Sequence, residues 1–162
     1  APSVRDKRNI AFRLLTEILG GSATTSRLNK RMREKLGLVY TVEATNTTFL
    51  DTGYLSVYFA TSRDELTHCI EIVKDEIEKM RTKPISISIL SKAKTRCIGQ
   101  FWLANENIES VILTYVRYLL DDIPYTPTTQ LLAEWHNIEA KDLLALANEY
   151  LRPEQLVTLL YV

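Results

Sequence analysis

Apolar residues recur at helical spacing in the first quarter of the chain. One stripe runs through the segment from Ser3 to Leu19, and Gly20 and Gly21 follow it as a helix stop. This stripe consists of Ile10, Leu14, Leu15 and Ile18. A second stripe, formed by Leu28, Met32 and Leu36, follows threonines that can cap a helix. The spacing predicts a helix over Ser3–Leu19 and another from Thr24 or Thr25 to Leu36.

The period then changes from about 3.6 residues to two. Gly37, expected in the left-handed conformation, separates the second helix from this alternation. Apolar and polar residues alternate over Leu38–Thr48 and over Gly53–Thr61, and the residues from Phe49 to Gly53 have turn composition. This pattern is typical of an antiparallel β-hairpin.

Helical spacing returns after the hairpin and continues through most of the remaining chain. We expect helices from Ser62 to about Met80, from Ser86 or Ser88 to a break at Asn105–Asn107, over Ile108–Leu119, from Thr128 or Thr129 across Trp135, and over Ala140–Leu151. The intervening breaks contain Pro84, Pro124, Pro127 and Pro153. The apolar segment Gln155–Val162 predicts a final strand.

Seven helices and three strands in this order predict an α/β (α+β) fold, with a small, mainly antiparallel sheet covered by helices. Three strands are few for so much helix, so we expect a further strand before Ser3 to complete the sheet. The chain also starts at Ala1 without a methionine. We therefore expect residues 1–162 to form a single domain that is a fragment of a larger protein.

Composition narrows the classes of partner. The 162 residues are 46% hydrophobic and 25% charged, as in an ordinary globular domain. The charges of the 20 basic and 20 acidic residues cancel, so the net charge gives no reason to expect binding to nucleic acid. No apolar run approaches the ~20 residues of a membrane-spanning helix. We expect neither a nucleic-acid partner nor a membrane span, and the sequence does not define the cellular compartment.

The two cysteines fall on the inward faces of predicted helices. Cys69 shares a face with Leu66 and Val73, and Cys97 shares one with Leu90 and Ala93. Both are predicted to be buried small hydrophobic side chains. A disulfide bridge and a reactive thiol are the alternatives.

The two histidines do not form a recognisable zinc site. His68 and His136 each begin an H-x-x-E sequence, but the inverted zinc motif needs a second histidine where this chain has Ile72 and Ala140. We therefore predict no metal ligands in this chain. The sequence also has no nucleophile elbow and no phosphate-binding glycine loop.

Basic residues are concentrated on the second helix. The cluster consists of Arg27, Lys30, Arg31, Arg33 and Lys35. Because the whole chain is neutral, we interpret this cluster as a solvated face rather than a nucleic-acid surface.

Arg33 and Tyr40 flank the glycine that separates this helix from the first strand. The turn at Gly37 can bring both side chains to one rim of the sheet, where a guanidinium fork and a phenol would suit a peptide carbonyl or a terminal carboxylate. The structural alternative is an arginine that caps helix carbonyls and a tyrosine packed at a sheet edge.

The segment Leu19–Ala44, LGGSATTSRLNKRMREKLGLVYTVEA, resembles the glycine-rich S-R-L-x-x-x-[IVL]-R-E-x-x-G-L-x-Y-x-V block of the insulinase, pitrilysin and mitochondrial-processing-peptidase family of zinc peptidases. The matching residues are Gly20, Gly21, Ser26, Arg27, Leu28, Arg33, Glu34, Gly37, Leu38, Tyr40 and Val42. Met32 stands where the family has a branched aliphatic residue.

This resemblance implies an architecture of two similar α/β halves that close around a peptide. In the catalytic half, an H-x-x-E-H motif on the first helix binds zinc, whereas Ser3–Leu19 contains no histidine. The chain therefore resembles the other, zinc-free half. That half supplies an arginine and a tyrosine that contact the substrate, which by motif position are Arg33 and Tyr40.

On this resemblance we expect a non-catalytic, substrate-binding half of a zinc metallopeptidase, inactive alone, with no catalytic residue and no cofactor of its own. Zinc is expected in a partner half, within the same chain or in a second subunit, and the substrate would be a peptide or unfolded polypeptide. The alternatives are a structural or assembly domain, and a peptide-binding module that offers the hairpin edge at Thr41–Thr48 for strand addition.

Overall fold

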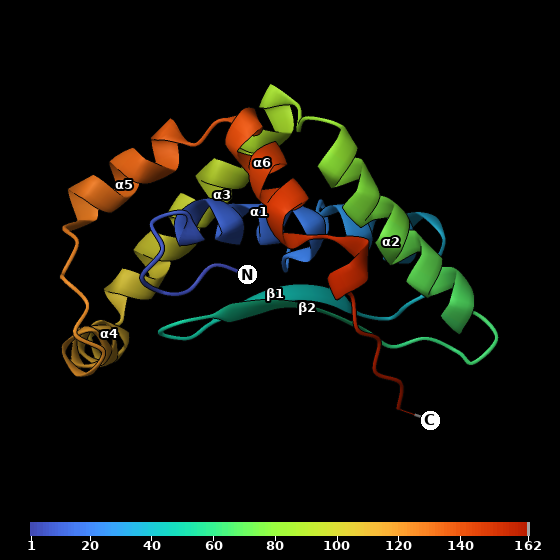
Figure 1. Cartoon of the computed structure of the whole chain (residues 1–162), viewed down its shortest axis with the longest axis horizontal. Helices are drawn as coiled ribbons and strands as arrows, with labels where there is room; N and C mark the ends of the chain where they lie inside the picture. Colours follow the sequence, from blue (N-terminus) through green and yellow to red (C-terminus); the bar gives the residue numbers. More distant parts are fainter. Residues whose placement is uncertain (162) are drawn as a thin grey trace.

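The computed structural model describes residues 1–161 and is built around the predicted antiparallel hairpin. Strand β1 (Val42–Thr48) pairs with β2 (Gly53–Phe59), in a register that places Val42 opposite Phe59 and Thr48 opposite Gly53. Helix α1 (Asn9–Gly20) crosses one face of this hairpin (Figure 1). The hairpin and α1 form the centre of the molecule.

Helix α1 lies close against β1 because its last residue is glycine. A Cβ atom on Gly20 would stand 2.8 Å from the Cβ atom of Ala44 and 3.0 Å from its backbone nitrogen. The close approach helps α1 to bury its apolar face, which consists of Phe12, Leu14, Leu15, Ile18 and Leu19. Each large side chain buried in this way stabilises the fold by roughly 1.5–3 kcal/mol.

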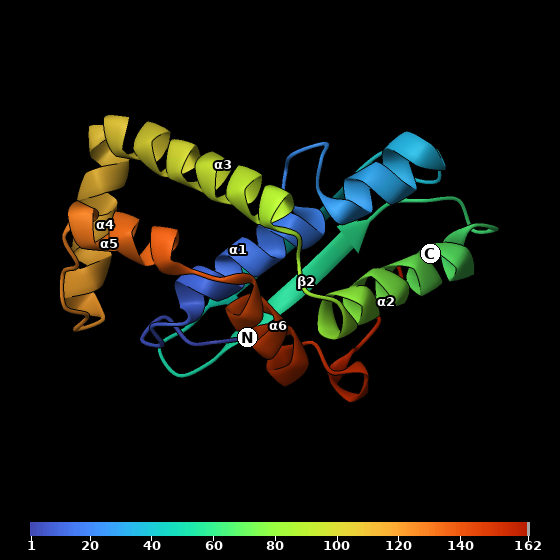
Figure 2. The ribbon, with the colours of Figure 1, turned by 90° about the horizontal axis from the view of Figure 1, so that it is seen from above.

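Three more helices surround α1. Helices α2 (Leu66–Thr82) and α6 (Ala140–Tyr150) pack against each other, and α1 contacts both α6 and α3 (Ile87–Glu106). All of these helices lie on the same side of the hairpin (Figures 1 and 2). The structure therefore has the predicted α+β fold, with a small antiparallel sheet and a helical layer.

An arm extends from this body. The second half of α3 leaves the core and continues into α4 (Ile108–Leu120) and α5 (Thr128–Asn137), which project to the left in Figures 1 and 2. Asn107 separates α3 from α4, because its side-chain oxygen accepts hydrogen bonds from the backbone N–H groups of Glu109 (2.9 Å) and Ser110 (3.3 Å). The predicted break thus contains a helix N-cap.

Apolar side chains are exposed on the α3 and α4 parts of the arm. No residue of α4 is buried. The exposed apolar side chains, which we call the arm face, are Trp102, Leu103, Ile108, Ile112, Leu113, Tyr115, Val116, Leu119 and Leu120. None of the helices within residues 1–161 is both long enough and apolar enough to cross a membrane.

Two helices begin later than predicted. The first begins at Asn9 rather than near Ser3, because residues 3–9 form turns in which Asp6 N–H donates to the Ser3 carbonyl and Asn9 N–H donates to the Asp6 carbonyl. Helix α2 begins at Leu66 rather than at Ser62, whose carbonyl accepts a turn hydrogen bond from Glu65 N–H. Propensity alone does not separate such a turn from a first helical turn.

The second predicted helix is mainly a π-helix, η1 (Asn29–Lys35; light blue in Figure 2). Leu28 and Met32 are buried as predicted, but Leu36 is 48% exposed, contrary to prediction. In an α-helix, residues 32 and 36 would share one face. The wider π turn, with hydrogen bonds to the fifth preceding residue, rotates Leu36 out of that face.

The strand predictions were wrong at two places. Strand β1 starts at Val42 rather than Leu38, because the Leu38 backbone bonds to Met32 and to the Thr61 hydroxyl instead of to a neighbouring strand. The predicted strand over Gln155–Val162 is absent from the described residues. Pro153–Gln155 form a short 3₁₀ turn, and residues 156–161 are exposed without a strand partner among residues 1–161. Val162 lies outside the described residues.

Candidate functional site

The motif segment is anchored to the body of the fold by Asn29. This side chain is only 4% exposed. Its amide nitrogen lies 3.2 Å from the Gly21 carbonyl oxygen, 3.0 Å from the Ser26 hydroxyl and 3.2 Å from the Val42 carbonyl oxygen. One buried amide therefore ties η1 to the end of α1 and to the first residue of β1. Removing the Asn29 amide would leave buried carbonyl groups without a hydrogen-bond donor.

A second anchor joins η1 to α2, and we call it the clamp: Arg27 and Arg31 with Asp75, Glu76 and Lys79. Arg31 donates a hydrogen bond of 2.7 Å to Glu76 and pairs with Asp75. Arg27 lies 3.4 Å from Glu76, and Lys79 lies 2.9 Å from the same carboxylate. Glu76 is only 6% exposed. A nearly buried carboxylate thus accepts contacts from three cations.

The prediction that the basic cluster is one solvated face was wrong for Arg27 and Arg31. Lys30, Arg33 and Lys35 are exposed, but the guanidinium groups of Arg27 and Arg31 turn back toward α2. The reason is the carboxylate pair Asp75–Glu76, which lies more than 40 positions further along the sequence.

The clamp also shifts the acidities of its members. Burial alone would raise the pKa of Glu76, but the hydrogen bonds from Lys79 and Arg31 outweigh this effect, and the net pKa is lowered. Hydrogen bonds from Lys79 and Arg31 lower the pKa of Asp75. The hydrogen bond to Asp75, with that to Glu76, raises the pKa of Arg31. All three groups therefore stay charged at neutral pH.

The chain reverses direction directly after η1. The N–H groups of Leu36, Gly37 and Leu38 donate to the carbonyls of Arg31 (3.2 Å), Arg33 (3.2 Å) and Met32 (2.8 Å), respectively. Gly37 has φ of +61°, the left-handed conformation that was predicted. The carbonyl of Leu38 then accepts a 2.7 Å hydrogen bond from the Thr61 hydroxyl, which fixes the approach to β1.

Arg33 and Tyr40 lie on either side of this turn, and both are exposed. The Tyr40 side chain precedes β1 and is 89% exposed, while its neighbour Val39 is buried. Arg33 is exposed on η1. Within residues 1–161, neither side chain takes part in a hydrogen bond or ion pair. The alternative interpretation, a capping arginine and a tyrosine packed at a sheet edge, does not describe these residues. Arg33 caps no helix carbonyl, and Tyr40 is not packed against the sheet.

The titratable residues considered as metal ligands or nucleophiles lie elsewhere. His68 and His136 are exposed on different helices, α2 and α5. Within residues 1–161, no three or more His, Cys, Asp or Glu side chains are grouped so that they could hold a metal ion. Cys69 and Cys97 are free and buried, as predicted, and burial raises the pKa of Cys97 to about 11.

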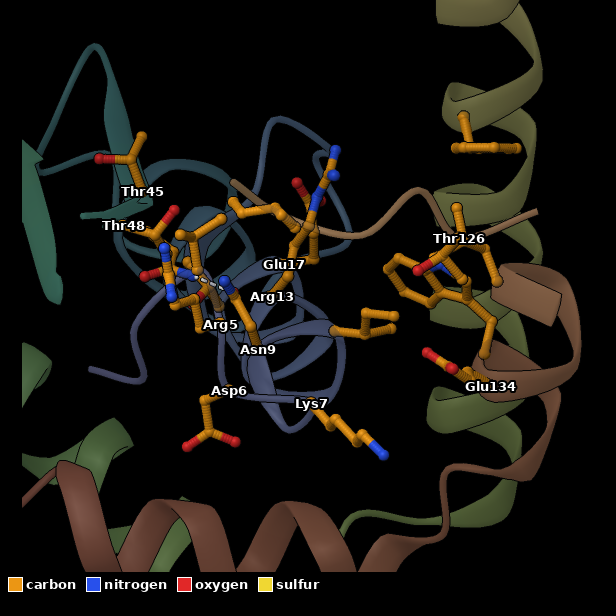
Figure 3. Close-up of a pocket in the computed structure, with 18 of the residues that line it drawn as sticks. Arg5, Asp6, Lys7, Asn9, Arg13, Glu17, Thr45, Thr48, Thr126 and Glu134 are labelled. Atoms are coloured by element: carbon orange, nitrogen blue, oxygen red, sulfur yellow. Dashed lines mark hydrogen bonds between the residues drawn. The ribbon is translucent and has the colours of Figure 1, made fainter. Parts of the chain in front are cut away.

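A cleft that the sequence did not predict opens between the body and the arm. Its volume is about 870 Å³, and α1, β1 and the α5 region line it. Figure 3 shows Asn9, Arg13 and Glu17 of α1 on one side, and Thr126 and Glu134 on the side of the arm. In the sequence, these α1 residues form only the polar face of a helix. The cleft could not be predicted, because its opposite wall comes from residues about 120 positions later.

Comparisons with known proteins agree with the motif. The family model described as the peptidase M16 inactive domain matches residues 1–97. An uncharacterized zinc protease of Rickettsia felis is 31% identical over 152 residues, which are 91% of this chain and 35% of that protein.

Solved structures share the fold. A peptidase M16 inactive domain from Pseudomonas fluorescens has a TM-score of 0.82 at 20% identity and covers 93% of this chain, with 36% of that chain matched. A chain of complex III2 from Candida albicans has a TM-score of 0.80 at 13% identity, over 91% of this chain and 37% of that chain.

The matched family model defines the class of this chain, an inactive domain of the zinc-protease type. The chain belongs to the peptidase M16 family, which confirms the family assignment made from Leu19–Ala44. The chain spans about a third of the length of the Rickettsia relative, 35%.

Proposed function

We propose that this chain is the substrate-binding half of an M16 zinc metallopeptidase and closes a proteolytic chamber over a peptide. Arg33 and Tyr40 contact the substrate in this proposal. Catalysis belongs to a partner half, which carries the zinc and lies either in the same polypeptide or in a second subunit. The family membership and the chain's 35% share of a zinc protease's length support this arrangement.

One observation carries the proposal. Arg33 and Tyr40 are exposed and make no hydrogen bond within the described chain, yet the backbone that presents them is held on both sides. Asn29 and the clamp hold η1, and the Thr61 hydroxyl holds Leu38. Polar side chains on a rigid support are typical of a binding site, because little conformational entropy is lost there when a ligand binds.

The chemistry of the two groups fits a peptide. The guanidinium of Arg33 offers a fork of N–H donors, and the phenol of Tyr40 can donate one hydrogen bond or accept one. Both can bind a substrate carbonyl or a terminal carboxylate, and such charge-assisted contacts are strong and directional. Their role is therefore to position the polypeptide relative to the catalytic half.

A second candidate function is a structural or assembly role. It is favoured by the fold similarity to a chain of complex III2 from Candida albicans, although at 13% identity that similarity concerns the fold alone. A third candidate, strand addition along β1, is disfavoured. Side chains already occupy the outward carbonyls at both ends of that strand, since Asn29 donates to Val42 and Arg117 donates to Thr48.

Steady-state peptide cleavage by the full-length protein tests the proposal. Arg33→Ala is expected to lower kcat/KM by about 10- to 100-fold, because it removes a charge-assisted hydrogen bond. Tyr40→Phe removes a neutral one and is expected to lower kcat/KM by about 3- to 10-fold.

Matched controls remove the same kinds of group from other exposed positions. Lys30→Ala removes another exposed cation of η1, and Tyr58→Phe removes the hydroxyl of a tyrosine that is 63% exposed on β2. Both are expected to cleave at the parental rate. Unchanged cleavage in Arg33→Ala and Tyr40→Phe would refute the substrate role, as would stoichiometric zinc in the 162-residue chain measured by elemental analysis.

A further inference from the structure

We propose that Glu76 is a positioning residue: by receiving Arg27 and Arg31, it holds η1 in its π-helical form and thereby sets the direction in which Arg33 and Tyr40 are presented. The part of this inference that concerns substrate rests on the proposed function. The part that concerns the conformation of η1 does not.

The first argument is that the π-helix needs external support. A π turn is rare and occurs mostly as a single turn inside an α-helix, frequently at a functional site, so a helical segment does not adopt this geometry by default. In η1 the turn ends with the Leu36 N–H donating to the carbonyl of Arg31, five residues earlier. The residue that closes this turn is thus the same arginine that donates its side chain to Glu76.

The second argument is electrostatic. Glu76 is 6% exposed, and the cationic groups that contact it, Arg27, Arg31 and Lys79, lie at 3.4, 2.7 and 2.9 Å. A nearly buried carboxylate is stabilised only when it is paired and hydrogen-bonded, and removing its charge leaves the surrounding cations with fewer partners. Asp75 is a weaker anchor for Arg31, because its side chain is 45% exposed.

The third argument is geometric. A π-helix contains one more residue in its turn than the corresponding α-helix. If η1 relaxed to α-helical geometry, the residues beyond the turn would shift by one position, which is about 100° around the helix axis. The Gly37 reversal and Tyr40, which follow the turn, would then point in another direction, and Arg33, which lies inside the turn, would rotate by a smaller angle. The clamp and Asn29 hold opposite sides of the same turn, one on α2 and the other on α1 and β1.

Hydrogen exchange in the full-length protein tests the conformational part. In Glu76→Gln, the amides of Leu36, Gly37 and Leu38 are expected to exchange about tenfold faster, because losing a charge-assisted contact favours local opening by that factor. Glu78→Gln is the matched control, since Glu78 lies on the same helix but pairs with Arg81 at 2.7 Å. It is expected to leave those three amides unchanged.

A milder variant keeps the inference testable if Glu76→Gln fails to fold. Arg31→Lys keeps the positive charge but replaces the guanidinium group, whose Nη1 contacts both Glu76 and Asp75, with an ammonium group on a shorter side chain. It is expected to change exchange at the same three amides by a smaller factor. If neither Glu76→Gln nor Arg31→Lys alters this exchange, the inference is wrong, whatever the enzyme kinetics show.

A double-mutant cycle tests the coupling to substrate. Glu76→Gln is expected to raise KM several-fold when Arg33 is present and to have a smaller effect in Arg33→Ala, where only the placement of Tyr40 can still change. Equal effects in both backgrounds would overturn the positioning role. If Arg33→Ala alone behaves as the parent, the proposed function fails, and the exchange experiment still decides whether Glu76 holds the turn.

Discussion

Gly37 is the most constrained backbone position of the candidate site. It combines φ of +61° with a reversal that carries the chain from η1 toward β1. A Cβ atom added there would meet no atom within 4 Å. The requirement for glycine is therefore conformational rather than steric, which explains why the position could be interpreted from the sequence alone.

Substituting this glycine tests that explanation. Gly37→Ala is expected to destabilise the chain by about 1–2 kcal/mol, the cost of placing an L side chain in the left-handed region. Gly37→Asn should cost less, because asparagine tolerates that region. The free energy of unfolding in urea measures both effects.

Gly99 provides the control for Gly37. It lies within α3, and a Cβ atom there also meets nothing within 4 Å. Gly99→Ala should therefore stabilise the chain by about 0.5–1 kcal/mol, since alanine is the better helix former. A neutral or stabilising Gly37→Ala would contradict the conformational explanation.

At the scale of elements, the clamp makes the attachment of η1 to α2 dependent on pH. The pKa values of Asp75 and Glu76 are lowered in the folded state. A carboxyl group with a lowered pKa binds fewer protons folded than unfolded, so its contribution to stability is present above its unfolded pKa and is lost as the pH falls through the folded value. Ordinary carboxyl values are about 3.9 for Asp and 4.3 for Glu.

Comparing the parent with Glu76→Gln over pH 2–7 checks this dependence. The difference in free energy of unfolding should be constant above about pH 5.5 and shrink as the pH falls below about 4. Glu78→Gln should show a much smaller difference, because its pair with Arg81 involves a side chain that is 52% exposed. A parent-minus-Glu76→Gln difference that stays constant down to pH 2 would contradict the role of Glu76.

The sequence predicted elements well where local signals determine them. The hairpin, the break at Asn107 and the helices after Pro84 follow from periodicity, turn residues and caps. The π-helix could not be predicted, because its geometry depends on Arg31 bonding to a helix more than 40 positions away. The strand expected at Gln155–Val162 failed because an apolar segment becomes a strand only beside another strand.

The candidate site, like the fold, could be predicted from the sequence only in part. Arg33 and Tyr40 could be selected from the motif, but their exposure and lack of hydrogen bonds required the structure. Asn29, Glu76 and the Thr61 hydroxyl were missed. Each supports the site through a contact between segments at least eight positions apart, and no residue pattern signals such a contact.

At the scale of the whole molecule, the arm face is the largest departure from a self-contained domain. Leu119 and Leu120 are each 81% exposed, and no residue of α4 is buried. Exposed apolar side chains recur three and four positions apart along α4, and apolar surface of this kind favours association in water. The body behaves differently, since the same helical periodicity there is buried against α1 and the hairpin.

The arm face leads to a prediction about solution behaviour. The 162-residue chain should self-associate with rising concentration in sedimentation velocity, and the double substitution Leu119→Lys/Leu120→Lys should reduce that association. Because both residues are exposed, the unfolding free energy should change by no more than about 0.5 kcal/mol.

Ile87→Lys serves as the comparison, since Ile87 is 84% exposed but lies at the start of α3, away from the arm. Association that is equally sensitive to Ile87→Lys, or insensitive to the double substitution, would show that the arm face does not drive it.

The burial of both cysteines has a practical consequence. Cys69 is fully buried, Cys97 is 4% exposed, and the pKa of Cys97 near 11 keeps its sulfur protonated at neutral pH. The folded chain therefore offers thiol reagents almost nothing to react with. A cysteine introduced by Thr41→Cys, at an exposed position next to Tyr40, would be the one labelled residue of this chain, so a fluorophore or cross-linker there would report on a bound polypeptide without removing Tyr40 or either native cysteine.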